Sequence, residues 1–291
     1  MINGFINLNK PNTVSSNKAL GILKHALRTL GIKEKVGHFG TLDPLAEGVL
    51  PVALGRATRL FDYSLDKVKV YEAEFLLGAD SPSLDKGTDI EYYPFEMPGE
   101  DIIERALNSL TGEVMQIPPA FSAKSVDGVR AYKLARSGED VVLQPKKVTI
   151  YSIRLISSDR ENKIVKVGIE CGGGTYVRSI ARDFGALLGT KCIMISLVRT
   201  QSGFFRIENA LSLAEAEKNP ESILANIVNL SDYLSSFPKT SVTEEEKRTL
   251  LNGITIDRDL SGLTAVFCGE TPIGIGENVE TGKMKIKTWL L

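Results

Sequence analysis

The sequence predicts an α/β protein of the α+β type with two domains. Its 291 residues exceed a typical single domain, and about 150 residues per domain gives a prior of two. Up to residue 232, stretches with apolar residues at helical spacing are interleaved with strand-like stretches of apolar residues. After residue 238, short strand-like runs are separated by glycines. We therefore place an α/β domain at residues 1–232 and a small β-rich domain at residues 238–291.

The composition is that of a soluble globular protein, with 43% hydrophobic and 24% charged residues. No apolar run approaches the ~18 residues that cross a bilayer, and the N-terminus lacks a secretion signal, so we expect a cytoplasmic protein without a membrane partner. The three cysteines are far apart and only two histidines are present, which predicts no disulfide and no metal site. The sequence has no Walker loop and no dinucleotide fingerprint, so we expect no cofactor.

The net charge of −1 conceals an uneven distribution of charged residues. Residues 1–60 carry eight basic and three acidic groups, residues 61–114 carry four and thirteen, and residues 120–154 carry seven and three. The ordinary explanation of such runs is a set of solvated faces. The alternative is that the two basic blocks bind a polyanion such as RNA.

The N-terminal segment predicts a strand followed by an amphipathic helix. Residues 4–11 have the pattern of a short strand that ends at a proline, after which Ser15 or Ser16 can cap a helix. Gly31 provides the signal that ends the helix. The apolar stripe of this helix consists of Leu20, Leu23, Leu27 and Leu30.

Residues 36–51 form one glycine-rich and proline-rich loop between apolar flanks. Its glycines allow backbone conformations that other residues avoid, and Pro44 keeps Asp43 out of helical space. The sequence therefore predicts that Asp43 is held on a stiff irregular turn. An Asx turn is the simplest explanation, and a functional carboxylate is the alternative.

The segment after this loop predicts a short helix at residues 57–65 and a strand at residues 68–78. Because side chains alternate along a strand, one face of the strand carries Tyr71, Ala73, Phe75 and Leu77. A tyrosine on such a face is normally a core residue. A second amphipathic helix is predicted around residues 103–110, with its end at Gly112.

A basic, proline-containing loop follows at residues 116–138, and residues 148–157 and 164–171 predict a β-hairpin. The glycine-rich turn at residues 172–178 opens a helix. Such a turn can hold a phosphate, although the signal is weak by itself.

Residues 192–200 predict a buried strand, in which Leu197 is a core residue by its type alone. In the C-terminal domain, Thr243 can cap a helix that runs to Leu251.

Three of these stretches resemble the TruB family of tRNA pseudouridine synthases. They are Gly-His-Phe-Gly-Thr-Leu-Asp-Pro-Leu-Ala-Glu-Gly-Val-Leu at residues 37–50, the loop at residues 116–138, and Gly-Thr-Tyr-Val-Arg at residues 174–178. The resemblance extends from about residue 4 to 210. It implies a catalytic domain built on a mixed, mainly antiparallel sheet, with an RNA-gripping insertion at about residues 120–150. The position of the C-terminal domain resembles that of the PUA domain in this family.

The resemblance also implies the residues of the active site. Asp43 matches the catalytic aspartate, and Arg178 matches an arginine that forms an ion pair with it. Arginine suits this place because a buried carboxylate needs a compensating charge to stay ionised. The resemblance implies further contacts with the substrate. Tyr71 matches the ring that stacks on the target uracil, Tyr176 matches a second tyrosine of the pocket, and Leu197 matches an apolar residue of its wall. His38 is an aromatic group suited to the flipped-out base, and Lys10 matches a lysine near the active site.

The basic loop implies RNA contacts at Lys124, Arg130 and Lys133. Two departures from the family pattern lie near these sites. One residue is missing between Ala123 and Lys124, and residues 79–87 lack the usual run rich in threonine and aspartate.

The implied activity is isomerisation of the T-arm uridine at tRNA position 55, by a monomer that needs no guide RNA. The reaction breaks a C–N glycosidic bond and forms a C–C bond, so it is redox-neutral. The sequence leaves open whether Asp43 attacks the sugar, attacks the base or assists proton abstraction. Two alternatives are a guide-dependent synthase of the related H/ACA class and a tRNA-binding or tRNA-folding chaperone. The intact set of Asp43, Tyr71 and Arg178 argues against a chaperone with a decayed site.

Overall fold

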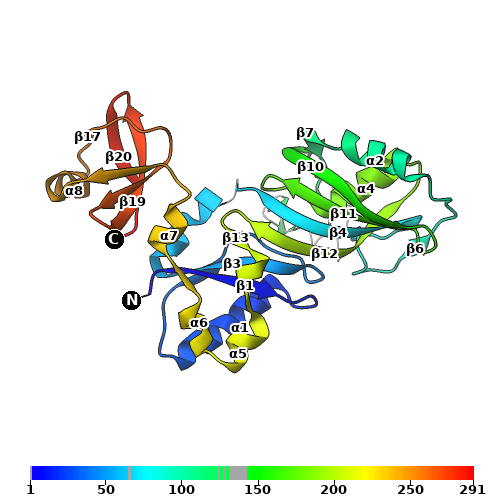
Figure 1. Cartoon of the computed structure of the whole chain (residues 1–291), viewed down its shortest axis with the longest axis horizontal. Helices are drawn as coiled ribbons and strands as arrows, with labels where there is room; N and C mark the ends of the chain where they lie inside the picture. The colour runs from blue at the N-terminus through cyan, green and yellow to red at the C-terminus, as the bar shows by residue number, and fades with distance from the viewer. Residues whose placement is uncertain (1, 65–66, 123–124, 127–128, 131–142) are drawn as a thin grey trace.

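The computed structural model describes residues 2–64, 67–122, 125–126, 129–130 and 143–291. One large sheet runs through the molecule, and a small β-rich unit lies beside the end of the sheet where the N-terminus is (Figure 1). The large sheet has the strand order β14-β1-β3-β12-β4-β11-β10-β7, with β2, β13 and β15 paired beside it. These strands are β1 Gly4–Lys10, β2 Val36–His38, β3 Glu47–Leu54, β4 Lys69–Leu77, β7 Gly112–Gln116, β10 Lys146–Asp159, β11 Ile164–Cys171, β12 Cys192–Ser202, β13 Phe205–Arg206, β14 Leu211–Ser212 and β15 Ile227–Asn229.

Helices cover the large sheet in two groups, with α1, α5 and α6 under the N-terminal half and α2 and α4 beside β10 and β11 (Figure 1). Two short strand pairs, β5 with β6 and β8 with β9, lie outside the large sheet. Within the described residues, no helix has both the length and the apolar composition needed to cross a bilayer. The bounds are α1 Ser16–Thr29, η1 Gly55–Ser64, α2 Glu100–Ser109, α4 Val177–Leu187, η2 Ile207–Asn209, α5 Leu213–Lys218, α6 Glu221–Ala225, α7 Leu230–Leu234, β5 Ala79–Asp80, β6 Glu91–Tyr92, β8 Ser125–Val126 and β9 Val129–Arg130.

Most neighbouring strands of the large sheet are antiparallel. This holds for β1 with β3, β4 with β12, β4 with β11 and β10 with β11. The parallel pairs are β3 with β12 and β1 with β14. The predicted fold class, an α/β domain on a mixed and mainly antiparallel sheet, is confirmed.

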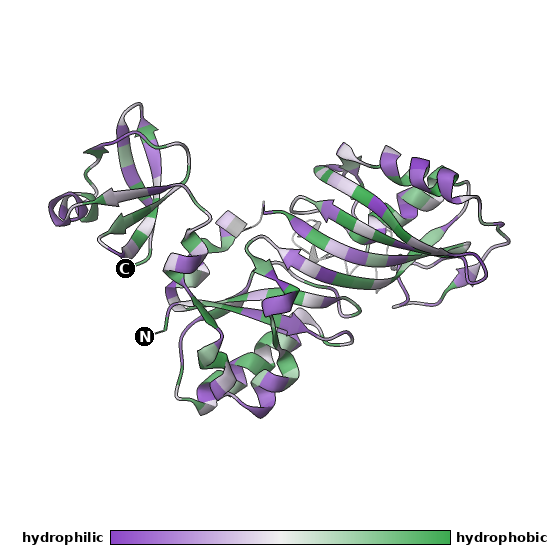
Figure 2. Cartoon of the chain, viewed as in Figure 1, coloured by the Kyte–Doolittle hydropathy of each residue, from purple (hydrophilic) through white to green (hydrophobic). Residues whose placement is uncertain are grey.

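Strand β4 shows the predicted alternation. Tyr71, Ala73, Phe75 and Leu77 are all buried, whereas the residues between them are half-buried. The colours of Figure 2 show the same alternation of apolar and polar residues along the strands of the large sheet. The buried face belongs to the main core, which extends to α1 and α4. The hairpin predicted from residues 148–157 and 164–171 is present as β10 and β11.

Helix α1 begins where the sequence predicts. The side chain of Ser15 accepts a hydrogen bond from the backbone N–H of Lys18, which satisfies one of the N–H groups left open at a helix start. Leu20, Leu23 and Leu27 are buried against the sheet. The helix therefore fixes the position of Ser16, whose side chain hydrogen-bonds to the backbone of Leu42 in the loop between β2 and β3.

Two local predictions need correction. Residues 36–51 do not form one loop, because both ends are strands: β2 pairs with β3 from Val36 opposite Leu54 to His38 opposite Val52. Only the segment between β2 and β3 is irregular. The segment predicted as a helix at residues 57–65 is a 3₁₀-helix, η1, which follows β3 directly at Gly55.

The C-terminal unit has its own sheet in the order β16-β18-β19-β20-β17. Thr243 caps helix α8 and, with Glu246, forms a capping box, as its position predicts. Arg59 Nη1 in η1 donates to the carbonyl oxygen of Trp289 at 2.7 Å, which joins this unit to η1. The domain boundaries and the PUA assignment stay predictions. The bounds are β16 Lys239–Val242, α8 Glu244–Leu251, β17 Ile256–Asp257, β18 Thr264–Cys268, β19 Thr271–Glu280 and β20 Lys283–Trp289.

Candidate active site

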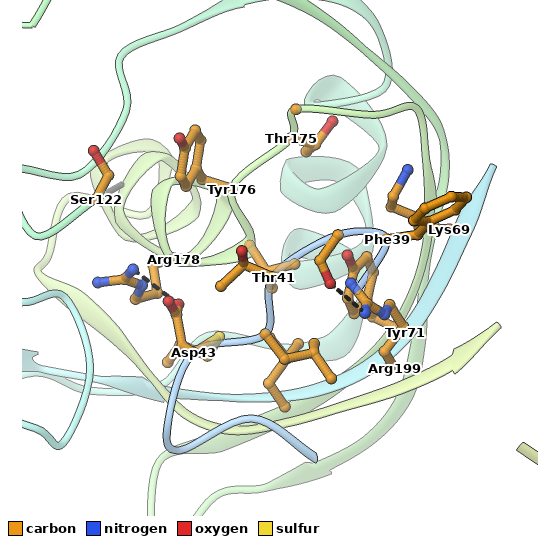
Figure 3. Close-up of a pocket in the computed structure, with 16 residues that line it drawn as sticks. Phe39, Thr41, Asp43, Lys69, Tyr71, Ser122, Thr175, Tyr176, Arg178 and Arg199 are labelled. Carbon is orange, nitrogen blue, oxygen red and sulfur yellow. Dashed lines mark hydrogen bonds and ion pairs between the residues drawn. The ribbon is translucent and has the colours of Figure 1, made fainter. Parts of the chain in front are cut away.

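A pocket of ≈ 270 Å³ lies where several segments meet, four of which supply most of its lining. They are the loop between β2 and β3, strand β4, the glycine-rich turn at the start of α4, and strand β12, and a fifth segment adds Ser122 to the wall (Figure 3). Five of the predicted site residues line this pocket, namely Asp43, Tyr71, Tyr176, Arg178 and Leu197. The fold thus brings together residues that are up to 154 positions apart in the sequence.

The loop that carries Asp43 is held by a hydroxyl group from α1. Ser16 Oγ donates to the carbonyl oxygen of Leu42 at 2.8 Å and accepts from the N–H of Leu42 at 2.9 Å. The loop can leave β2 and join β3 because Gly40 and Gly48 have φ of 95° and 99°. A Cβ at Gly48 would lie 2.3 Å from the carbonyl oxygen of Arg199, so only glycine fits there.

Asp43 and Arg178 form an ion pair in the pocket. Arg178 Nη2 lies 2.8 Å from Asp43 Oδ2, and the two side chains point toward each other (Figure 3). The side chain of Arg178 is 5% exposed and that of Asp43 is 38% exposed. The guanidinium is therefore part of the buried wall, while the carboxylate faces the pocket.

Arg178 is fixed by more than Asp43. Its Nη1 donates to the carbonyl oxygen of Ser83 at 2.9 Å, and its Nη2 donates to that of Phe121 at 3.0 Å. Its Nη1 also lies 3.5 Å from Asp85 Oδ2. Asp85 is buried and accepts hydrogen bonds from Ser83 Oγ and from the N–H of Gly87. Arg178 thus lies between two carboxylates, and its donors are aimed in fixed directions.

Sequence reasoning gave Asp85 no role. The only signal was its place in residues 79–87, the segment that departs from the family pattern.

Gln116 was also missed, although it begins the basic loop. Its side-chain amide donates to the carbonyl oxygen of Tyr176 at 3.2 Å and accepts from the N–H of Tyr176 at 2.8 Å. This pair of bonds fixes the backbone from which Tyr176 enters the pocket.

Arg199 is a further pocket residue that the sequence did not assign. It is 1% exposed. Its Nε donates to the carbonyl oxygen of Val49 at 2.7 Å and its Nη2 to that of Gly40 at 3.0 Å. Arg199 therefore joins β12 to both ends of the loop that carries Asp43. Burial raises the pKa of the Tyr71 phenol, and the nearby charge of Arg199 acts in the opposite direction.

His38 and Lys10 do not line the pocket among the described residues. Burial, with the charges of Arg199 and Lys24, lowers the pKa of His38, and its Nδ1 has no hydrogen-bond partner in the described structure. Its contact with substrate stays a prediction. Lys10 is fully buried, and its Nζ donates to the carbonyl oxygens of Pro11 and Val14, both at 2.7 Å, and to that of Pro44 at 3.4 Å. It therefore lies beside the loop that carries Asp43, and its contact with substrate stays a prediction.

The predicted RNA contacts Lys124 and Lys133 lie outside the described residues. The backbone of Arg130 is in β9. The part of the chain that the structure describes holds no group of three or more histidine, cysteine or acidic residues that could bind a metal ion.

Residues 27–177 match a family model described as "TruB family pseudouridylate synthase (N terminal domain)". A tRNA pseudouridine synthase B of Francisella philomiragia is 37% identical over 288 residues, which cover 97% of this chain and 93% of that protein. A protein of the same name from Clostridium acetobutylicum is 35% identical and covers 89% of this chain and 87% of its own length. The crystal structure of a Cbf5-Nop10-Gar1 complex includes a chain with a TM-score of 0.74 and 24% identity, covering 99% of this chain and 85% of that one.

Proposed function

The chain belongs to the TruB family of pseudouridylate synthases, and from this premise we propose that it converts the T-arm uridine at tRNA position 55 to pseudouridine, without a guide RNA. The observation that carries the proposal is the Asp43–Arg178 ion pair in a pocket that also contains Tyr71, Tyr176 and Leu197. A pocket with one half-exposed carboxylate, two phenol rings and apolar walls suits a flat, uncharged base attached to a ribose.

The reaction needs no group from outside the chain and the RNA. The bond between ribose C1′ and uracil N1 breaks, a bond between C1′ and C5 forms, and the proton of C5 is replaced by one at N1. Asp43 is the carboxylate that faces the pocket, and it can act at the sugar, at the base or in proton abstraction. Arg178 holds this carboxylate in one orientation through a charge-assisted contact.

The target uridine must leave its stack to enter such a pocket. Tyr71 is buried on the pocket side of β4, where its ring can stack on the uracil, and Leu197 forms an apolar wall on β12. His38 precedes the loop and remains our candidate for the aromatic group beside the flipped-out nucleotide. Outside this site, we propose that Lys124, Arg130 and Lys133 contact RNA phosphates, and that the protein acts as a cytoplasmic monomer.

The test is mass-spectrometric mapping of pseudouridine in bare tRNA incubated with the pure protein. We expect one new pseudouridine at position 55 with the wild type and none with Asp43→Asn, whose tRNA affinity should stay close to normal. Asp89→Asn, which changes an exposed aspartate in the same way, is the matched control and should remain active. Product that appears only after a guide RNA is added would favour the guide-dependent alternative. Tight tRNA binding without any product would favour the chaperone.

A further inference from the structure

Thr41 is a polar residue of the active-site pocket that takes no part in holding the site together. It lies in the loop between β2 and β3, two residues before Asp43, and its side chain lines the same pocket. In Figure 3 it lies between the Asp43–Arg178 pair and Tyr71. Two residues of chain span at most about 7 Å, so a nucleotide held against Asp43 also lies beside Thr41.

The backbone on both sides of Thr41 is fixed. The carbonyl oxygen of Gly40 accepts a hydrogen bond from Arg199 Nη2 at 3.0 Å. The N–H and the carbonyl oxygen of Leu42 are both bonded to Ser16 Oγ, at 2.9 Å and 2.8 Å. A threonine side chain has few rotamers, because its Cβ is branched. The hydroxyl of Thr41 is therefore confined to a small region of the pocket before any ligand binds.

This hydroxyl is also uncommitted. Thr41 makes no side-chain hydrogen bond to any residue that the structure describes, and its side chain is exposed in the open pocket. Thr175, a second threonine of the wall, differs in this respect, because its Oγ1 donates to the carbonyl oxygen of Gly172 at 3.0 Å. An oriented hydroxyl without a protein partner is well suited to bind a ligand, because little ordering remains to be done on binding.

The isomerisation has a place for such a donor. Breaking the C1′–N1 bond leaves its electron pair on the uracil, where N1 shares it with the carbonyl oxygen at C2. A hydrogen bond to this oxygen becomes stronger as the charge develops, so it lowers the barrier. A half-turn of the uracil about the axis through N3 and C6 then brings C5 to the place of N1. The same half-turn brings the C4 carbonyl to the place of the C2 carbonyl.

We propose that the Thr41 hydroxyl donates a hydrogen bond to the uracil carbonyl oxygen beside the glycosidic bond, which is O2 in the uridine and O4 in the pseudouridine. The inference rests on the proposed function and adds a residue that contacts the base where its charge changes. One hydroxyl serves both positions, because the two carbonyl groups exchange places in the half-turn. Arg178 does not compete for this contact, because its guanidinium is committed to Asp43 and to two backbone carbonyl groups.

The test compares single-turnover rates of the full-length protein on a T-arm stem-loop with uridine or 2-thiouridine at the target position. Thr41→Val replaces the hydroxyl by a methyl group, and we expect the rate on uridine to fall by about 10-fold to 100-fold, the range for a lost hydrogen bond to a charged group. Affinity for the stem-loop should change little, because the contact strengthens during the reaction. Thr41→Ser keeps the hydroxyl and should retain most of the rate. Sulfur accepts hydrogen bonds poorly, so the difference between the wild type and Thr41→Val should largely disappear on 2-thiouridine.

Thr29→Val is the matched control, because it removes the hydroxyl of an exposed threonine at the end of α1, outside the pocket. It should react like the wild type on both substrates. Equal rates for Thr41→Val and the wild type on uridine would overturn the proposal, as would a ratio of the two rates that is the same for uridine and 2-thiouridine. A Thr41→Ser variant as slow as Thr41→Val would overturn it too.

Two further outcomes separate this inference from its neighbours. If 2′-deoxyuridine at the target position weakens binding to the wild type but not to Thr41→Val, the hydroxyl binds the ribose and the proposal is wrong. A wild type that forms no pseudouridine overturns the proposed function and this inference with it. A wild type that is active beside an equally active Thr41→Val overturns the inference alone.

Discussion

Arg178 Nη2 lies 2.8 Å from Asp43 Oδ2, although the two residues come from turns 135 positions apart. The contact joins the N-terminal loop to the first turn of α4, and the guanidinium is the more deeply buried partner. Asp43 is half-exposed, whereas Asp85 beside the same guanidinium is buried, so loss of Arg178 would leave the buried carboxylate of Asp85 without its counter-charge. The pair therefore links the stability of the site to its chemistry.

We expect Arg178→Ala to lower the single-turnover rate on a T-arm stem-loop by orders of magnitude, because Asp43 and Asp85 lose their shared counter-charge. Arg178→Lys should restore only part of the rate, since lysine supplies the charge without the planar geometry. Arg182→Ala, a half-exposed arginine one turn further along α4, is the control. Rates measured across a pH range that superimpose for all these proteins would refute a role for the Asp43–Arg178 pair.

Asp85→Asn should reduce the rate by about 10-fold to 100-fold, because a misplacement of about 1 Å at a positioning group has effects of up to this size. The amide keeps one acceptor for Ser83 and Gly87 but gives up the charge that faces Arg178. Asp80→Asn, which affects a pair with the exposed Lys191, should leave the rate within twofold of the wild type. An Asp85→Asn enzyme with full activity and unchanged thermal stability would show that Arg178 needs only Asp43.

Arg199→Gln should destabilise the fold by about 3 kcal/mol, since two hydrogen bonds from a buried, charged donor are lost, each worth about 1.5 to 3 kcal/mol. The loop that carries Asp43 loses the side-chain hydrogen bonds that tie Gly40 and Val49 to β12, so kcat should fall more than KM rises. Urea unfolding and steady-state kinetics measure the two effects separately. Arg206→Gln on β13, which is exposed, is the control. Loss of stability with normal kcat would mean that Arg199 supports the fold but not the position of Asp43.

Lys10 should make stability depend on alkaline pH. Burial lowers the pKa of Lys10 from the ordinary 10.5 to about 8. Between these two pKa values the unfolded chain binds the proton more tightly than the folded chain, so the unfolding free energy rises with pH. Below pH 8 the folded chain bears the full cost of burying the charged ammonium. The shift corresponds to a gain on the order of 3 kcal/mol across this window.

The measurement is urea unfolding from pH 7.5 to 10, with Lys10→Met as the variant that lacks this titration. The wild type should gain stability relative to Lys10→Met as the pH rises. Lys18→Met, at an exposed site on α1, should run parallel to the wild type. Parallel curves for Lys10→Met and the wild type would mean that Lys10 titrates as an ordinary exposed lysine.

The sequence by itself determined the features that depend on neighbouring residues. The period-two pattern of Tyr71, Phe75 and Leu77 was sufficient to place a half-buried strand, and Ser15 was sufficient to start α1, because side-chain alternation and helix capping are local effects. The family resemblance gave five residues of the pocket, because their types and order are written along the chain. The resemblance also carried the mixed sheet, which no local pattern could establish.

Only the tertiary structure decided which distant groups meet. Asp85 belongs to the site because the chain folds it against Arg178, and Ser16 holds the loop because α1 packs beside Leu42. Lysine is usually a surface residue, but Lys10 lies at the end of a buried strand, and its ammonium donates to backbone carbonyl groups. Arg199 acquires its two carbonyl partners when β12 pairs with β3 and β4. Such contacts depend on the packing of the whole core, and a single sequence encodes them only through the fold.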